Sequence, residues 1–142
     1  MENKITSFRD EYFFLSNFYP CDIEFNNLTY HSAEAAFQAQ KCLDVEERRV
    51  FTELTPSQAK RQGKKVKLRP DWEDVKLGIM KAIVFNKFMQ NTMLMYKLLD
   101  TGDADLIEGN NWGDTFWGVC KGKGQNNLGK ILMEVRNKID RF

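Results

Sequence analysis

The stretch Tyr30 to Lys41, "YHSAEAAFQAQK", predicts a short helix that packs closely against its neighbours. Ser32 is suited to cap this helix, which we expect to run as far as Leu43. At 100° per residue, one side of the helix is formed by alanines, whose small side chains permit close packing. The other side carries Glu34, Phe37, Gln38 and Lys41. From periodicity alone, this polar side is either a solvated surface or a functional face.

The composition indicates a globular protein with one hydrophobic core. The chain has 142 residues, of which 42% are hydrophobic, 13% aromatic and 29% charged, with a formal net charge of +1. This length and composition favour a single domain over residues 1–142 and exclude the highly charged profile of a disordered chain. The near-zero net charge argues against binding nucleic acid mainly through bulk electrostatics.

Histidine and cysteine, the residue types that transition-metal sites and histidine-based triads need, are scarce. Cys21, Cys42 and Cys120 are widely separated and form no CxxC pair, so we expect reduced thiols rather than disulfides or a zinc site. His31 is the only histidine, which disfavours a transition-metal site and a histidine-based triad. No apolar run is long enough to span a membrane and the start of the chain lacks the apolar region of a signal peptide, so a cytoplasmic location is expected.

Turn and cap signals divide the chain into short elements. Asn26-Asn27 between "DIEF" and "LTY" predicts a small hairpin. A helical piece is expected from Val45 to Leu54, and Thr55-Pro56 opens another helix that stops near Gly63. Apolar spacing from Asp71 to Leu99 predicts one or two long helices.

The last third of the chain combines a glycine-rich loop with a structural helix. The loop "EGNNWGDTFWGVCKGKGQNN" is too long and too aromatic for an idle connection, so it is expected to carry site residues. The final helix is expected to open around Asn126-Asn127 and to bury one apolar stripe. Together these elements predict a mostly helical α+β domain with a few short N-terminal strands.

Several motifs, in order along essentially the whole chain, resemble the NADAR family, also described as riboflavin-intermediate N-glycosidases. The most specific are the S-x-E-x-x-F-Q-A-x-K helix and the D-x-x-W-G element, here Asp114, Trp117 and Gly118. "FLSNFYP", "LRPDW" and "NNLGKILMEVR" add to the resemblance. It implies metal-independent, cofactor-free cleavage of an N-glycosidic bond, in ADP-ribosylated guanine or in a phosphoribosylamino-pyrimidine of the riboflavin pathway. One departure is the loop "IEGNNWGDTFWG", where family members often have an acidic-small-Pro stretch.

Both implied substrates join ribose C1′ to an exocyclic amine, and this chemistry suggests roles for the polar helix face. Lys41 is a candidate nucleophile that would form a Schiff base with C1′. Glu34 would shuttle protons to O4′ and to the leaving nitrogen. In a competing mechanism, Asp114 or Glu34 activates a water molecule and no covalent bond forms. The sequence leaves both mechanisms open.

The resemblance also implies a set of substrate-binding residues. We expect Trp72 and Trp117 to be platforms for the base, and Glu108 to orient a ribose hydroxyl. Asn17 is a candidate polar contact to ribose or phosphate, while a basic segment that ends at Arg69 is a candidate phosphate contact. The set is completed by Gln38 and Gly118. We expect the pocket to lie between the Ser32 to Leu43 helix, the Asp71 to Leu99 region and the Glu108 to Gly118 loop.

Two other classes of function remain open from the sequence. A binding module for ADP-ribose or a related nucleotide would use the same residues without turnover, and a purely structural protein would bind no nucleotide. For the enzyme, the expected partner is its substrate, a small-molecule nucleotide or an ADP-ribosylated nucleic acid. Neither a membrane nor an obligate protein partner is expected.

Overall fold

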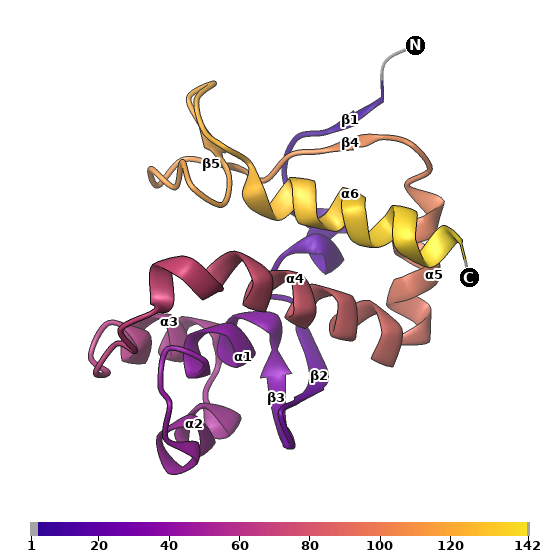
Figure 1. Ribbon diagram of the computed structural model, residues 1–142. Helices are drawn as coiled ribbons and strands as arrows, with labels where there is room; N and C mark the ends of the chain where they lie inside the picture. Colours follow the sequence, from indigo (N-terminus) through magenta and orange to yellow (C-terminus); the bar gives the residue numbers. More distant parts are fainter. Residues whose placement is uncertain (1–2, 142) are drawn as a thin grey trace. The chain divides into compact units, whose positions relative to one another are not determined.

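A tight hairpin leads directly into the first helix of the computed structural model, which describes residues 3–141 (Figure 1). Strand β2 (Pro20–Phe25) pairs antiparallel with β3 (Leu28–Ser32). Asn26 and Asn27 connect them with φ angles of 50° and 70°, as a two-residue turn with left-handed backbone requires. The predicted hairpin is confirmed.

The chain forms two compact units. The central unit is Asn17–Asn91, and the terminal unit combines Met1–Ser16 with Thr92–Phe142. The mixture of helices with a few short strands confirms the predicted α+β class. The expectation of a single domain over the whole chain stays a prediction.

The core of the central unit is built around helix α1 (Ala33–Ala39), which packs against β3, α3 (Pro56–Gly63) and α4 (Trp72–Gln90). All seven residues of α1 are buried. The Ser32 hydroxyl caps the helix by accepting a hydrogen bond from the Ala35 N–H at 3.1 Å. The small alanines allow the neighbouring elements to approach on several sides.

Helix α1 ends four residues before the predicted end at Leu43, and this part of the prediction was wrong. After Ala39 the backbone tightens, because the N–H groups of Gln40, Lys41 and Cys42 each bond to the carbonyl three residues earlier. Lys41 therefore lies in a turn that follows the helix.

The predicted segment from Val45 to Leu54 is split into α2 (Val45–Val50) and a 3-10 helix, Phe51–Glu53. Helix α3 begins with Pro56 at its first position, as predicted. Thr55 and Gln58 form a reciprocal capping box there, which satisfies two backbone donors at the helix start.

The region from Asp71 to Leu99 forms two helices, α4 and α5 (Thr92–Asp100). Asn91 interrupts them with a non-helical backbone, and its side-chain amide donates to the Lys87 carbonyl at 2.8 Å. This bond satisfies a carbonyl at the end of α4 and accounts for the break.

The terminal unit contains short parallel strand pairs and one long helix. Strand β1 (Lys4–Ile5) pairs with β4 (Asp105–Leu106), and β5 (Gly109–Asn110) pairs with β6 (Val119–Cys120). A six-residue 3-10 helix, Asp10–Leu15, follows β1. Helix α6 (Asn127–Asp140) begins where predicted and buries its apolar stripe, Leu128, Ile131, Leu132, Val135 and Ile139.

Within residues 3–141, no helix has the length and hydropathy needed to cross a membrane.

Lys87, in the last turn of α4, is an unusual core residue because it is only 1% exposed. Its Nζ lies 5.2 Å from the ring centroid of Phe88 and 5.8 Å from that of Tyr19. Burial lowers the pKa of Lys87 from 10.5 to about 8, against a smaller opposing effect of Cys21.

Lys87 makes a testable contribution to the pH dependence of stability. Between pH 8 and 10.5 the folded protein has lost the Lys87 proton while the unfolded chain keeps it, so the free energy of unfolding increases with pH. Relative to that of a Lys87→Met variant, the free energy of unfolding of the wild type should increase by up to about 1.4 kcal/mol per pH unit in this window. Denaturant unfolding of both proteins at several pH values measures the difference. If the difference in free energy of unfolding between the two proteins does not change with pH, the lowered pKa of Lys87 is contradicted.

Candidate active site

Glu34 is a buried carboxylate in the first turn of α1. Its backbone N–H donates to the Asn17 carbonyl at 2.9 Å, and the residue is only 9% exposed. The Gln38 amide, one turn further along the helix, donates from Nε2 to Glu34 Oε2 at 2.7 Å. These bonds fix the carboxylate close to the positive end of the helix, where a negative charge is favoured.

Two buried amide oxygens lie on residues bonded to Glu34. Gln38 Oε1 and Asn17 Oδ1 have no hydrogen-bond partner within residues 3–141. Asn17 uses its amide nitrogen in a 3.4 Å contact to the sulfur of Met80. A buried acceptor without a partner is costly, so both oxygens are suited to receive donors from a ligand.

Lys41 is half-buried in the turn after α1, and its surroundings disfavour the charged amine. Burial is the largest influence on the pKa of Lys41 and lowers it. The Glu34 carboxylate opposes this effect, whereas the charges of Lys64 and Lys76 add to it. The net result is a lowered pKa, which increases the fraction of neutral, nucleophilic amine.

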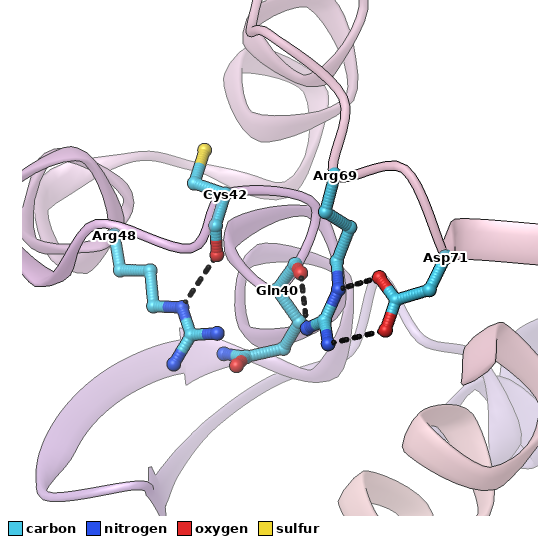
Figure 2. A network of polar contacts seen from close by, with 5 residues as sticks. All are labelled: Gln40, Cys42, Arg48, Arg69 and Asp71. Atoms are coloured by element: carbon cyan, nitrogen blue, oxygen red, sulfur yellow. Dashed lines mark hydrogen bonds and ion pairs between the residues drawn. The ribbon is translucent and has the colours of Figure 1, made fainter.

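The backbone on one side of Lys41 is held by Arg69 (Figure 2). The Arg69 guanidinium donates to the Gln40 carbonyl at 3.3 Å and to both carboxylate oxygens of Asp71 at 2.7 and 3.1 Å. The backbone N–H of Arg69 also donates to the Lys41 carbonyl, at 3.0 Å. This geometry gives Arg69, predicted as a substrate contact, a structural part in holding the turn.

Arg48 holds the other side of the same turn. Its Nε donates to the Cys42 carbonyl at 2.8 Å, and Figure 2 shows the Arg48 guanidinium at the left of this turn and the Arg69 guanidinium at its right. The carbonyls of three consecutive residues, Gln40 to Cys42, therefore all accept hydrogen bonds from an arginine. Carbonyls at a helix end lack intrahelical partners, so these bonds stabilise the position from which Lys41 projects.

Trp72, the first residue of α4, is buried beside Lys41. The Lys41 Nζ lies 5.9 Å from the Trp72 ring centroid, and the Phe37 ring packs against the same indole at 5.0 Å and 52°. Trp72 is 6% exposed. The indole thus provides the apolar surface that partly desolvates Lys41, in addition to its predicted role as a platform for a base.

In the terminal unit, Glu108 and Gly118 lie against each other. The Val119 N–H donates to the Glu108 carbonyl at 2.9 Å, within the β5–β6 pairing. A Cβ atom at position 118 would collide with that carbonyl and would approach Glu108 Oε2 to 2.9 Å. Gly118 is therefore required for close strand approach, independently of any contact with substrate.

Asp114 organises the loop that carries Trp117. Its Oδ1 accepts hydrogen bonds from the backbone N–H groups of Phe116 at 3.2 Å and Trp117 at 2.9 Å. Asn110 bonds to both the N–H and the carbonyl of Asp114, at 3.0 and 2.8 Å. The rings of Phe116 and Trp117 meet edge to face at 4.8 Å. These contacts give the loop one defined conformation.

The predicted site residues thus form two groups, one in each unit. The central unit brings together Asn17, Glu34, Gln38, Lys41, Arg69 and Trp72. The terminal unit holds Glu108, Asp114, Trp117 and Gly118 in one loop. Sequence reasoning missed Gln40 and Arg48, because carbonyl acceptors and an arginine in a charged helix give no signal in a single sequence.

No group of three or more His, Cys, Asp or Glu residues within 3–141 has the arrangement needed to hold a metal ion.

Comparisons with known proteins match this architecture. A model of the NADAR domain matches residues 5–140. N-glycosidase YbiA of Escherichia coli is 36% identical over 98% of this chain and 91% of its own length. N-glycosidase Npun_R5314 of Nostoc punctiforme is 37% identical over 87% of this chain and 83% of its own length. The NMR structure of the E. coli protein YbiA has a TM-score of 0.86 and 35% identity, covering 99% of this chain and 88% of that one.

A larger relative carries the same region as one part of its sequence. Riboflavin biosynthesis protein VVA0006 of Vibrio vulnificus is 42% identical over 89% of this chain, which spans only 35% of that protein.

The chain belongs to the NADAR family. The prediction that it is an enzyme of the N-glycosidase class is confirmed.

The loop contacts of Asp114 can be separated from a chemical role by two substitutions. Asp114→Ala removes the acceptor of two backbone N–H groups and should lower the free energy of unfolding by about 1–2 kcal/mol. Asp114→Asn keeps an oxygen in the same place and should be destabilised far less. Denaturant unfolding measures both variants. Equal stability of Asp114→Ala and wild type would show that the hydrogen bonds to Phe116 and Trp117 are not important for the loop.

Proposed function

We propose that the protein hydrolyses an N-glycosidic bond between ribose C1′ and an exocyclic amine of a base, through a Schiff base on Lys41. The observation that carries this proposal is the half-buried position of Lys41 beside the Trp72 indole, where burial lowers the pKa of Lys41 and the buried Glu34 carboxylate partly opposes this effect. The leading substrate classes are ADP-ribosylated guanine and phosphoribosylamino-pyrimidines of the riboflavin pathway. The V. vulnificus relative, named as a riboflavin biosynthesis protein, supports the second class.

The proposed reaction begins with ring opening of the glycosylamine. The nitrogen lone pair forms an imine at C1′ while O4′ takes a proton from Glu34. Neutral Lys41 then attacks C1′, so that a new C1′–Nζ bond forms and the bond from C1′ to the base nitrogen breaks. The ionised Glu34 carboxylate takes a proton from the attacking Nζ and passes it to the base nitrogen, so that the base leaves as its free amine. Water adds to the resulting lysine imine, which releases the sugar aldehyde and restores the amine of Lys41.

A water mechanism without a covalent intermediate is the alternative route to the same products. Glu34 or Asp114 would remove a proton from water as it attacks an oxocarbenium-like C1′. The lowered pKa of Lys41 favours the covalent route, because it increases the fraction of amine that has a lone pair with which to attack. The Asp114 oxygen that accepts the Phe116 and Trp117 N–H groups already serves the loop, which favours Glu34 as the acid and base.

The buried acceptors of the central unit suit the sugar part of the substrate. We assign Asn17 Oδ1 and Gln38 Oε1 to ribose hydroxyls, because an acceptor must meet a donor and a phosphate offers none at neutral pH. The exposed cations after α3, Lys64 and Lys65 among them, are better suited to phosphate. Trp72 and Trp117 remain the proposed platforms for the base, and Glu108 the proposed partner of a ribose hydroxyl.

Borohydride trapping tests the covalent step directly. The protein is incubated, without added metal, with ADP-ribosylated guanine DNA or with a phosphoribosylamino-pyrimidine, and borohydride is then added. Mass spectrometry should find the released base and a reduced sugar adduct on Lys41. Lys41→Ala should lose the adduct and most of the turnover, whereas Lys130→Ala, an exposed lysine of α6, should retain both.

The other outcomes distinguish the competing functions. Product without an adduct would overturn the Schiff base and favour the water mechanism. A substrate that raises the melting temperature but is never cleaved would instead indicate a binding module, since any ligand that binds only the folded state stabilises it. If neither substrate is cleaved or bound, both substrate classes are wrong.

A further inference from the structure

Gly63, the last residue of α3, lies directly against the side chain of Gln38. An added Cβ at position 63 would collide with the Oε1 and Cδ atoms of Gln38, and would lie 3.3 Å from its Cβ. The colliding atoms are the far end of a flexible side chain, so the fold can accept the new methyl group if the Gln38 amide moves away.

The Gln38 amide has little freedom to move without breaking its bond to Glu34. Its Nε2 donates to Glu34 Oε2 at 2.7 Å, and Gln38 is 7% exposed. Both residues belong to α1, whose seven residues are all buried, so the helix backbone cannot shift to compensate. Displacement of the amide therefore breaks this hydrogen bond to the Glu34 carboxylate.

We propose that Gly63 is a positioning residue for the reaction. By carrying no side chain, it leaves the space in which Gln38 holds Glu34 in place. The proposal rests on the proposed role of Glu34 as the acid and base, and it assigns a function to a helix end that touches no substrate.

The local backbone does not by itself require glycine at position 63. Gly63 is helical, and alanine is a better helix former than glycine at such positions. Gly78, in the middle of α4, is a matched control because a Cβ there would meet no atom within 4 Å. Gly78→Ala makes the same chemical change in a helix where no side chain has to move.

Kinetics of the two alanine variants test the proposal. Gly63→Ala should lower kcat by roughly 10- to 100-fold, because small displacements of catalytic groups have effects of this size. KM should rise as well, because the displaced Gln38 Oε1 is also the proposed partner of a ribose hydroxyl, and the variant should still fold. Gly78→Ala should leave kcat and KM unchanged. If Gly63→Ala and Gly78→Ala behave alike, the proposal is overturned.

A double variant shows whether Gly63 acts through Gln38. Gln38→Ala removes the Oε1 and Cδ atoms that a residue 63 side chain would meet, and should itself lower kcat. In the Gln38→Ala background, Gly63→Ala should lower kcat little further, because both changes break the bond between Gln38 and Glu34. If the kcat reductions of the two single variants simply multiply in the double variant, Gly63 does not act through Gln38.

A measurement without substrate separates this proposal from the proposed function. The Glu34 carboxylate raises the pKa of Lys41, so loss of the bond that positions this carboxylate in Gly63→Ala should shift the pH dependence of Lys41 acetylation to lower pH. Mass spectrometry of partly acetylated protein measures this shift. A shift in Gly63→Ala but not in Gly78→Ala supports positioning even if neither substrate is cleaved. An unchanged Lys41 profile in both variants contradicts it.

Discussion

The burial of α1 on all sides is the constraint on which the proposed site depends. A helix of seven residues with no exposed face has to satisfy its polar groups within the protein or through a ligand. Ser32 and Asn17 do so at its start, and the Gln38 amide pairs with Glu34 in its interior. A carboxylate held in this way is restricted to one position and has few competing water molecules. Such preorganisation is what an acid and base needs at a reacting bond.

The same constraint acts on the residues after the helix. The three carbonyls from Gln40 to Cys42 accept hydrogen bonds from Arg48 and Arg69, and the amine of Lys41 projects from this rigid turn beside Trp72. Burial lowers the pKa of Lys41 while the neighbouring carboxylate raises it. The net effect is a pKa of Lys41 below its ordinary value. The Glu34 carboxylate thus acts on the protonation of Lys41, and we treat the two residues as one unit.

Local sequence signals predicted the elements that depend on neighbouring residues. The Asn26-Asn27 hairpin and the Thr55 capping box are specified by residues a few positions apart, and both are present. The early end of α1 was not predictable in this way, since it is held by Arg69, 29 residues from the carbonyl it contacts. The space at Gly63 also depends on the packing of α3 against α1. Interactions between distant elements therefore decide the details of the site.

The titration of Lys41 tests the central claim, that Glu34 and Lys41 form one charge-coupled unit, most directly. NMR of the Lys41 side-chain nitrogen as a function of pH would give its pKa in the wild type and in Glu34→Gln. We expect a pKa below the ordinary lysine value of 10.5 in the wild type, and a still lower pKa in Glu34→Gln because the opposing carboxylate charge is gone. An ordinary lysine pKa that does not change in Glu34→Gln would contradict the account.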